Sequence, residues 1–213
     1  VINRIKSLRD INSKFSVLDV GCGDGNLLFN LRNSFPNSSL YGIDLNIEST
    51  KKTLKSFNIN LIEGSLADID FNERFDFICN SQLLEHLENP SDLINLISSN
   101  LKKNGIAFLD VPNAESKSFK VFGRNWVHLD TPRHRILYTP TSLKSILMKN
   151  RFNVIEIKTF GSGFAYLTSL LHVLKETYNI NLNISFKLKW IFAKVIQVFI
   201  KSDDKLFVVF KLK

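Results

Sequence analysis

Cysteine is scarce in this 213-residue chain, which contains only Cys22 and Cys79. The two cysteines have neither the spacing of a zinc site nor the number that a disulfide framework requires. Both lie in apolar surroundings, so we expect two reduced thiols in a cytoplasmic protein. The disulfide-rich secreted class is therefore excluded.

Long uninterrupted hydrophobic runs are also missing. No stretch reaches the roughly 18 uncharged residues that a membrane-spanning helix needs, and no internal repeat or low-complexity tract is present. Hydrophobic residues make up 44% of the chain and charged residues 23%, which is ordinary for a globular protein. This length predicts a single domain over residues 1–213 with a substantial core.

Acidic residues are few in the C-terminal third. Residues 144–213 contain 12 Lys/Arg and 4 Asp/Glu, whereas residues 1–143 contain 16 of each, so the whole net charge of +8 lies in the last third. This asymmetry is typical of a region that meets an anionic partner, such as a membrane surface, a phosphorylated substrate or a nucleic acid. A solvated lysine-rich surface explains it equally well.

Glycine is concentrated in one short segment near the N-terminus. Three of the nine glycines fall within "VLDVGCGDGN", residues 17–26, directly after an apolar run. Such a cluster indicates a turn with positive φ, or a ligand that approaches the backbone closely. A dinucleotide fingerprint reads G-x-G-x-x-G, but its third glycine would fall at Asn26, and this disfavours an NAD-dependent oxidoreductase.

Acidic residues near the glycines restrict the ligand further. Asp44 follows Gly25 by 19 residues, at a position where a carboxylate accepts hydrogen bonds from both ribose hydroxyls. Asp19 and Asp24 would repel a pyrophosphate. The predicted ligand therefore carries a ribose and few or no phosphates. A binding module that keeps this site without turnover remains an alternative.

Apolar runs alternate with helix-like segments through residue 112, and this alternation predicts an α/β fold with a parallel sheet. Ligands bind such sheets at the carboxyl ends of the strands. Residues 113–138 are predicted to form a long polar and aromatic loop, and about forty residues of helical pattern separate the last two strands. Strands are expected at 16–20, 39–44, 59–63, 75–80, 106–111, 153–160 and 205–212, and helices at 26–33, 47–57, 91–101 and 141–150.

Five motifs occur in a familiar order: "VLDVGCGDG", "YGIDLN", "LIEGSLADIDF", "FDFICNSQLLEHLENP" and "LKKNGIAFLDVPN". Over about residues 15–160 the chain thereby resembles the class I S-adenosylmethionine-dependent methyltransferases, and in particular the ubiquinone-pathway O-methyltransferases. The resemblance implies a Rossmann-like seven-stranded sheet of order 3-2-1-4-5-7-6, with the last strand antiparallel and helices on both faces. It divides the domain into a cofactor-binding half (15–112), a substrate lid loop (113–140) and a helical insert between strands six and seven (161–204).

The same resemblance implies the cofactor, S-adenosyl-L-methionine, and the residues that bind it. The glycine loop would pass near the methionine portion, Asp44 would bind the ribose, and the residues after strand four would line the methyl-transfer site. Ser65 stands where the family often has aspartate, which weakens that contact. The implied cofactor residues are Asp19, Gly21, Cys22, Gly23, Gly25, Asp44, Leu45, Asn46, Ser65, Leu66, Asn80, Ser81 and Gln82.

Methyl transfer to a hydroxyl group additionally needs a base with a pKa near neutrality. His86 follows strand four and is the first candidate, although packing under the lid explains it equally. The ubiquinone-pathway enzymes have an E-x-x-E-H pattern here. This chain has Gln82 in the first position and keeps only Glu85 and His86, so no metal site is predicted.

A second cluster, "NWVHLDTPRH", covers residues 125–134. It resembles a W-x-x-x-D-x-P-R-H stretch in a subgroup of these enzymes, many of them associated with polysaccharide and other cell-surface biosynthesis. His134 is the second candidate base, and Trp126 is predicted to stack on a sugar or ring. Arg133 is predicted to bind a phosphate or carboxylate of the substrate, or alternatively only to pair with Asp130.

The segment "FKLKWIFAKVIQVFIK", residues 186–201, is mostly apolar, with Lys187, Lys194 and Lys201 on one helical stripe. It is expected either to lie in an anionic membrane interface or to pack on the sheet or a second subunit. A nucleic-acid partner is disfavoured, because "NSQL" stands where base-modifying enzymes of the class have N/D-P-P-[YF]. We predict O-methylation of a small-molecule, glycan or lipid-linked acceptor by a cytoplasmic enzyme, peripheral to the inner face of the membrane.

Overall fold

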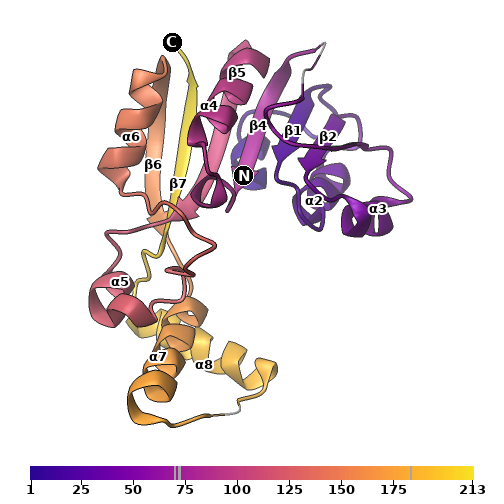
Figure 1. Ribbon diagram of the computed structural model, residues 1–213. Coiled ribbons are helices and arrows are strands. Elements are labelled where there is room, and N and C mark those ends of the chain that lie inside the picture. The colour runs from indigo at the N-terminus through magenta and orange to yellow at the C-terminus, as the bar shows by residue number, and fades with distance from the viewer. Residues whose placement is uncertain (70, 72, 183) are drawn as a thin grey trace.

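The computed structural model describes the chain except residues 70, 72 and 183 and the side chain of residue 199; residue 70 of the third motif therefore lies outside the described residues. Seven strands form one sheet in the order β3-β2-β1-β4-β5-β7-β6, which confirms the predicted order (Figure 1). Strands β1 to β5 pair in parallel, and β7 runs antiparallel to both β5 and β6. The strands are β1 Ser16–Val20, β2 Ser39–Asp44, β3 Asn60–Glu63, β4 Phe75–Ser81, β5 Leu101–Pro112, β6 Phe152–Phe160 and β7 Lys205–Leu212.

The helices begin where the local sequence supplies capping groups. The Asn89 side chain accepts a hydrogen bond from the Ser91 N–H at the start of α4, and Thr139 and Ser142 form a capping box at the start of α6, which satisfies backbone donors that lack a partner within the helix. The described helices are α1 Ile2–Lys6, α2 Asn26–Ser34, α3 Glu48–Leu54, α4 Pro90–Asn100, α5 Lys117–Phe122, α6 Pro140–Lys149, α7 Gly163–Tyr178 and α8 Phe186–Phe199.

Alternating strand residues build a separate hydrophobic core on each face of the sheet. Val17 and Phe77 point to one face and pack with residues of α1, α2 and α3. Leu18 and Ile78, the next residues along the same strands, point to the other face and pack with α4 and α6. The two-residue period of a strand produces this division, and helices on both faces cover the sheet as predicted.

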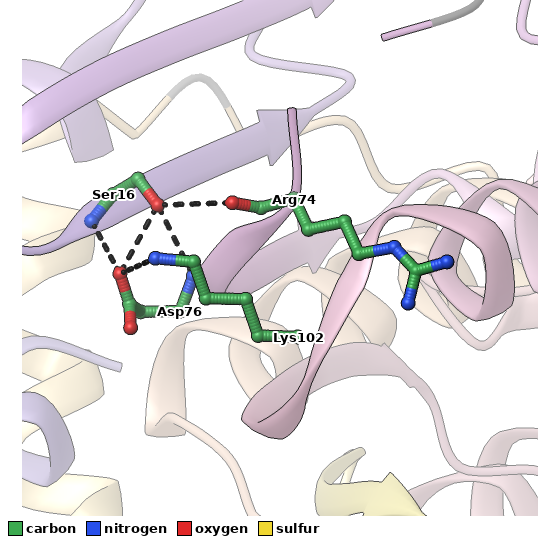
Figure 2. A network of polar contacts seen from close by, with 4 residues as sticks. All are labelled: Ser16, Arg74, Asp76 and Lys102. Atoms are coloured by element: carbon green, nitrogen blue, oxygen red, sulfur yellow. Dashed lines mark hydrogen bonds and ion pairs between the residues drawn. The ribbon is translucent and has the colours of Figure 1, made fainter. Parts of the chain in front are cut away.

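A polar network joins the amino-terminal ends of β1 and β4 to β5 (Figure 2). Asp76 Oδ2 accepts hydrogen bonds from the Ser16 backbone N–H at 2.9 Å, the Ser16 hydroxyl at 3.1 Å and Lys102 Nζ at 2.7 Å. In the alternative orientation of its proton, that hydroxyl can donate to the Arg74 carbonyl oxygen, 3.4 Å away. The network fixes the strand register at the edge of the sheet opposite the carboxyl ends of the parallel strands.

The predicted loop over 113–138 is wrong in part, because it contains α5 and a short 3-10 turn, Gly123–Asn125. The Ser116 side chain caps α5 by accepting a hydrogen bond from the Phe119 N–H. A helix of this length shows too few turns for an apolar period to stand out in the sequence.

Residues 161–204, here called the helical lobe, contain α7 and α8 and lie at one end of the sheet beside α5 (Figure 1). The predicted helical insert between strands six and seven is therefore present. Lys205, where β7 begins, pairs with Phe160 at the end of β6 and with Pro112 at the end of β5. The lobe thus leaves the sheet at the edge where the parallel strands end. Among the described helices, none is both long and apolar enough to cross a membrane.

Candidate active site

The glycine loop after β1 needs glycine for two independent reasons. Gly21 and Gly25 have φ of 73° and 80°, which side chains rarely adopt. A Cβ at Gly21 would lie 3.0 Å from Leu83 Cδ2, and one at Gly25 would lie 2.8 Å from Leu54 Cδ1. The loop therefore combines the positive φ expected from the sequence with close packing against neighbouring side chains.

Neighbouring strands hold the loop in place. Asp44, at the end of β2, accepts a hydrogen bond from the Gly23 N–H at 2.8 Å, and the Thr50 hydroxyl donates to the Gly23 carbonyl oxygen. The buried Asn80 side chain, on β4, donates to the Val20 carbonyl oxygen at 2.9 Å. Asp44 and Asn80 thus lie beside the loop and order its backbone, and their contacts with a cofactor stay a prediction.

A cavity of about 130 Å³ lies beside the loop, at the carboxyl ends of β1, β2 and β3. It is lined by several of the predicted cofactor residues: Gly21, Asp44, Leu45, Ser65 and Leu66. Five further lining residues were not predicted from the sequence: Ile43, Gly64, Leu83, Leu87 and Asp92. Leu83 and Leu87 come from the segment after β4, in which the sequence predicts only polar side chains as site residues.

Negative charge is concentrated around this cavity. Burial, together with the charges of Asp44 and Asp24, raises the pKa of Asp19 to about 7. Burial and the charges of Asp19 and Asp44 raise the pKa of the Cys22 thiol to about 12, so Cys22 contributes backbone rather than a thiolate. A positively charged ligand would relieve the repulsion between these carboxylates, whereas a phosphate would add to it.

His86, in the short 3-10 turn Leu84–His86 after β4, and His134 lie together, with ring centroids 4.6 Å apart. His134 Nδ1 lies 2.7 Å from the His128 carbonyl oxygen, and His86 Nδ1 lies 3.0 Å from the Arg133 carbonyl oxygen. A carbonyl can only accept, so each Nδ1 carries the proton and each Nε2 of the neutral ring carries a lone pair. Burial lowers the pKa of His134 below its usual value, which keeps its ring neutral at pH 7.

Glu85 lies beside His86 and His134, and the sequence did not predict this cluster of three side chains. Both of its carboxylate oxygens are buried without a hydrogen-bond partner among the described residues. Its pKa is raised to about 7, mainly by burial and in part by the charge of Asp110, with Lys205 acting in the opposite direction. One potential ligand atom each from Glu85, His86 and His134 lies within 4.8 Å of the other two. Although no metal site was predicted, a carboxylate with two imidazoles is a set that could hold a divalent cation such as zinc.

Trp126 does not occupy the position expected of a substrate-stacking residue. Its ring is buried, its Nε1–H donates to Asp204 Oδ1 at 2.9 Å, and its ring centroid lies 5.0 Å from that of Phe119 and 5.4 Å from that of His128. No open ring face remains for a sugar, so this prediction is corrected: Trp126 fixes its own segment, which was predicted as a lid, to Asp204.

Arg133 forms the ion pair of its alternative interpretation, and its contact with a substrate phosphate or carboxylate stays a prediction. Its exposed guanidinium forms an ion pair with Asp130 three residues earlier. The backbone carbonyl oxygen of Arg133 accepts the hydrogen bond from His86, so this residue contributes to the site through its main chain as well.

Asp110, near the end of β5, is a site residue that sequence reasoning missed. Its side chain accepts hydrogen bonds from Gln82 Nε2 at 3.1 Å and from the Ser81 hydroxyl at 3.3 Å. Gln82 has a φ of 53°, which is unusual for a residue with a side chain. Asp110 therefore holds the segment that enters the predicted methyl-transfer site. An aspartate near the end of an apolar strand, "FLDVPN", was the available signal.

The strand order, the glycine loop after β1 and the carboxylate after β2 together define a Rossmann-like methyltransferase fold. A family model described as a methyltransferase domain matches residues 2–157. The chain belongs to this methyltransferase family. The predicted class and its cofactor, S-adenosylmethionine, are confirmed.

Relatives agree with this assignment. The ubiquinone biosynthesis O-methyltransferase of Rickettsia canadensis is 25% identical over 167 residues, covering 74% of this chain and 71% of that protein. The Rickettsia typhi enzyme of the same name is 26% identical over 171 residues, covering 74% and 68%. Among solved structures, a SAM-dependent methyltransferase from Archaeoglobus fulgidus has a TM-score of 0.63 at 20% identity, covering 99% of this chain and 92% of its own, and it shows the same fold.

Proposed function

We propose that this enzyme transfers the methyl group of S-adenosylmethionine to a hydroxyl group of a small-molecule, glycan or lipid-linked acceptor. The observation that supports this most directly is the pair of imidazoles at the sheet edge, each with its Nδ1 engaged by a carbonyl and a lone pair on Nε2. The Rickettsia relatives are named as O-methyltransferases, and this supports oxygen as the accepting atom.

In this proposal the residues of the glycine loop and Asp44 bind the cofactor, and His134 removes the acceptor proton. His134 is preferred over His86 because its buried ring is held by the His128 carbonyl and stays neutral at pH 7. Displacement at the sulfonium methyl is in line, so alignment of the acceptor oxygen supplies much of the acceleration. The base supplies a further factor on the order of 10²–10⁴.

The test uses three alanine variants and S-adenosylmethionine with a radioactive methyl group. Because the acceptor is unidentified, the probes are a catechol, 3,4-dihydroxybenzoate, and a lipid extract. His134→Ala is expected to lower turnover by about 10²–10⁴-fold while cofactor affinity stays unchanged. His172→Ala, at an exposed position on α7, is the control and should retain full turnover.

The outcomes separate the alternatives. If His86→Ala alone slows turnover, the base is His86. If neither change has an effect on a measurable rate, neither His86 nor His134 is the base. Cofactor binding without turnover on any acceptor would favour the binding-module alternative.

We further propose that α8 contacts an anionic membrane surface. α8 packs against α7 rather than on the sheet, and its exposed side carries apolar residues that are each about half exposed or more: Phe186, Trp190, Ile191, Phe192, Val195 and Val198. The surrounding charge is basic, with five lysines and one glutamate between residues 163 and 201. Lys201 lies beyond the end of α8, so the predicted helical stripe keeps only Lys187 and Lys194.

Vesicle flotation tests this contact. The protein is expected to float with phosphatidylglycerol vesicles at low salt and to be released at high salt, since screening weakens surface charge interactions. Ile191→Asp should abolish flotation, whereas Ile11→Asp, a matched change at an equally exposed isoleucine far along the chain, should not. Equal flotation of the two variants would contradict the proposal.

A further inference from the structure

The loop that carries His134 is held together by its own hydrogen bonds. His134 Nδ1 donates to the His128 carbonyl oxygen at 2.7 Å. The Leu129 N–H donates to the Trp126 carbonyl oxygen at 3.0 Å. Residues 126–134, here called the histidine loop, are therefore bonded to one another, and whatever fixes the start of this loop also helps to fix the ring of His134.

The histidine loop begins at a buried carboxylate of the helical lobe. Trp126 Nε1–H donates to Asp204 Oδ1 at 2.9 Å, and Asp204 Oδ2 accepts a hydrogen bond from the Ser202 hydroxyl. Both Trp126 and Asp204 are buried. The Asp204 backbone carbonyl oxygen accepts a hydrogen bond from the Asn113 N–H at 2.8 Å. The start of the loop is thus tied to the end of β5 and the start of β7.

A second contact from the lobe holds the next residue of the loop. The Val127 N–H donates to the Ser169 hydroxyl oxygen at 3.0 Å. That hydroxyl donates in turn to the Ala165 carbonyl oxygen at 2.9 Å, within α7, and Ser169 is fully buried. Both anchors belong to residues 161–204, so the helical lobe, and not the sheet alone, sets the position of the histidine loop.

The carboxylate of Asp204 gives the Trp126 ring one direction. A buried charge is costly unless hydrogen bonds pair it, and packing beside an indole ring needs only an apolar side chain. A carboxylate, however, forms a short and directional hydrogen bond with the indole N–H. The ring centroid of His128 lies 5.4 Å from that of Trp126. A shift of the indole would therefore carry His128 with it, and so the carbonyl that bonds to His134.

We propose that Asp204 is a positioning residue for His134. It holds Trp126, and the loop that starts there places the His128 carbonyl against His134 Nδ1, which leaves the lone pair of the His134 ring on Nε2. This inference rests on the proposed function, in which His134 removes the acceptor proton. Asp204 acts only through the histidine loop.

The first test reads the His134 ring without any acceptor. The protein is labelled with ¹⁵N-histidine, and two-bond ¹H–¹⁵N correlation spectra distinguish the ring nitrogens at a pH at which the ring is neutral. His134→Ala identifies the His134 signals among those of the four histidines. In the unchanged protein we expect the proton on Nδ1, because the hydrogen bond of one ring nitrogen sets the tautomer. Asp204→Ala should give a mixture in which Nε2 is also protonated.

Three variants accompany Asp204→Ala. Asp204→Asn keeps an oxygen that can accept from the Trp126 indole, so it should keep the proton on His134 Nδ1. Trp126→Phe removes the same hydrogen bond from the donor side, serves if Asp204→Ala does not fold, and should give the same mixture. Asp76→Ala is the matched control, because Asp76 also accepts hydrogen bonds from two neighbours, but at the opposite edge of the sheet. It should leave the His134 signals unchanged.

Turnover gives the second readout, with the probe acceptors and radioactive cofactor described above. Asp204→Ala should lower kcat by about 10–100-fold, because a small displacement of the reacting groups is costly. Affinity for S-adenosylmethionine in calorimetry should stay the same. Asp204→Asn should recover most of the loss in kcat, and Asp76→Ala should show none.

A proton that stays on His134 Nδ1 in folded Asp204→Ala and Trp126→Phe proteins would overturn the proposal. Equal losses of kcat in Asp204→Ala and Asp76→Ala would do so as well. The inference and the proposed function fail separately. A change of tautomer without turnover on any acceptor would uphold the positioning role and disprove the proposed function. An unchanged tautomer, in a protein whose turnover depends on His134, would do the reverse.

Discussion

The cofactor half of the chain and the helical lobe meet at the same edge of the sheet but are built on different principles. In the proposed cofactor half, the glycine loop is fixed at the strand ends, and a Cβ at Gly21 or Gly25 would crowd Leu83 or Leu54. In the lobe, two helices meet closely at Gly163 and leave apolar side chains exposed along α8.

The two regions also differ in how the family model covers them. The family model covers the cofactor half and ends before the lobe. A sulfonium nucleoside imposes the same demands on every member: room at the backbone, a carboxylate for the ribose and no repulsion of positive charge. The acceptor differs between methyltransferases, and the helical lobe is a region of this chain that could contact it.

The largest expected effect tests the cofactor half. Asp44→Ala removes the acceptor for the ribose hydroxyls and the contact to the Gly23 N–H. Two hydrogen bonds to a charged group are worth about 1.5–3 kcal/mol each, so we expect affinity for S-adenosylmethionine to fall by at least about 100-fold in calorimetry. Asp10→Ala, at an exposed aspartate, is the control. Unchanged affinity in Asp44→Ala would disprove the ribose assignment.

A pH dependence of cofactor affinity is the next effect. The pKa of Asp19 is raised to about 7 by burial and by its acidic neighbours, and a cationic ligand favours the ionised carboxylate. Affinity for S-adenosylmethionine should therefore rise about tenfold between pH 6 and pH 8. Asp19→Asn should remove this dependence, and a pH-independent affinity in the unchanged protein would show that the cofactor does not sense Asp19.

The raised pKa of Asp19 also makes the folded state less stable as the pH rises, whereas cofactor affinity increases over the same range. A carboxyl that holds its proton more tightly when folded stabilises the protein fully below the unfolded pKa of about 4, and this contribution is lost as pH rises through about 7. Asp19→Asn should therefore raise Tm relative to the unchanged protein at pH 8, with little difference at pH 4. A lower Tm at pH 8 would contradict the assignment.

A smaller effect comes from the opposite edge of the sheet. Asp76→Asn weakens the contacts with Ser16 and Lys102 shown in Figure 2, and we expect a loss of about 1–2 kcal/mol in urea unfolding. Cofactor affinity should stay the same. Glu48→Gln breaks an exposed ion pair with Lys52 and should cost about 0.5 kcal/mol or less. Similar losses in the two variants would show that the network does not fix the register.

The smallest expected effect is that of removing metal. With Gln82 in place of the first carboxylate of the relatives' pattern, turnover is expected to survive dialysis against EDTA. If EDTA abolishes turnover and Zn²⁺ or Mg²⁺ restores it, then Glu85, His86 and His134 hold a cation and the role of His134 as a base is disproved.

Much of the fold could be predicted because its signals are local. Apolar runs bounded by turn residues placed the strands within a few residues, and three of them, β1, β2 and β7, begin and end where the sequence predicts. Element ends fray, so α3 is shorter than expected and β5 begins earlier.

The remaining errors depend on contacts between distant segments. The sequence predicts that Trp126 stacks on a substrate. Its actual partner, Asp204, lies 78 residues away, so the residues next to Trp126 give no sign of the contact. The sequence predicts His86 and His134 as two separate candidate bases, and only the folded chain brings their rings together beside Glu85. The burial that sets the pKa of Glu85 likewise has no signature in the residues next to it.

The most direct measurement is a pair of calorimetric titrations of the purified protein, one with S-adenosylmethionine and one with NADH. The account predicts micromolar binding of S-adenosylmethionine and none of NADH, because the loop and its carboxylates fit a cationic nucleoside without phosphates. Binding of NADH, or binding of neither compound, would contradict it.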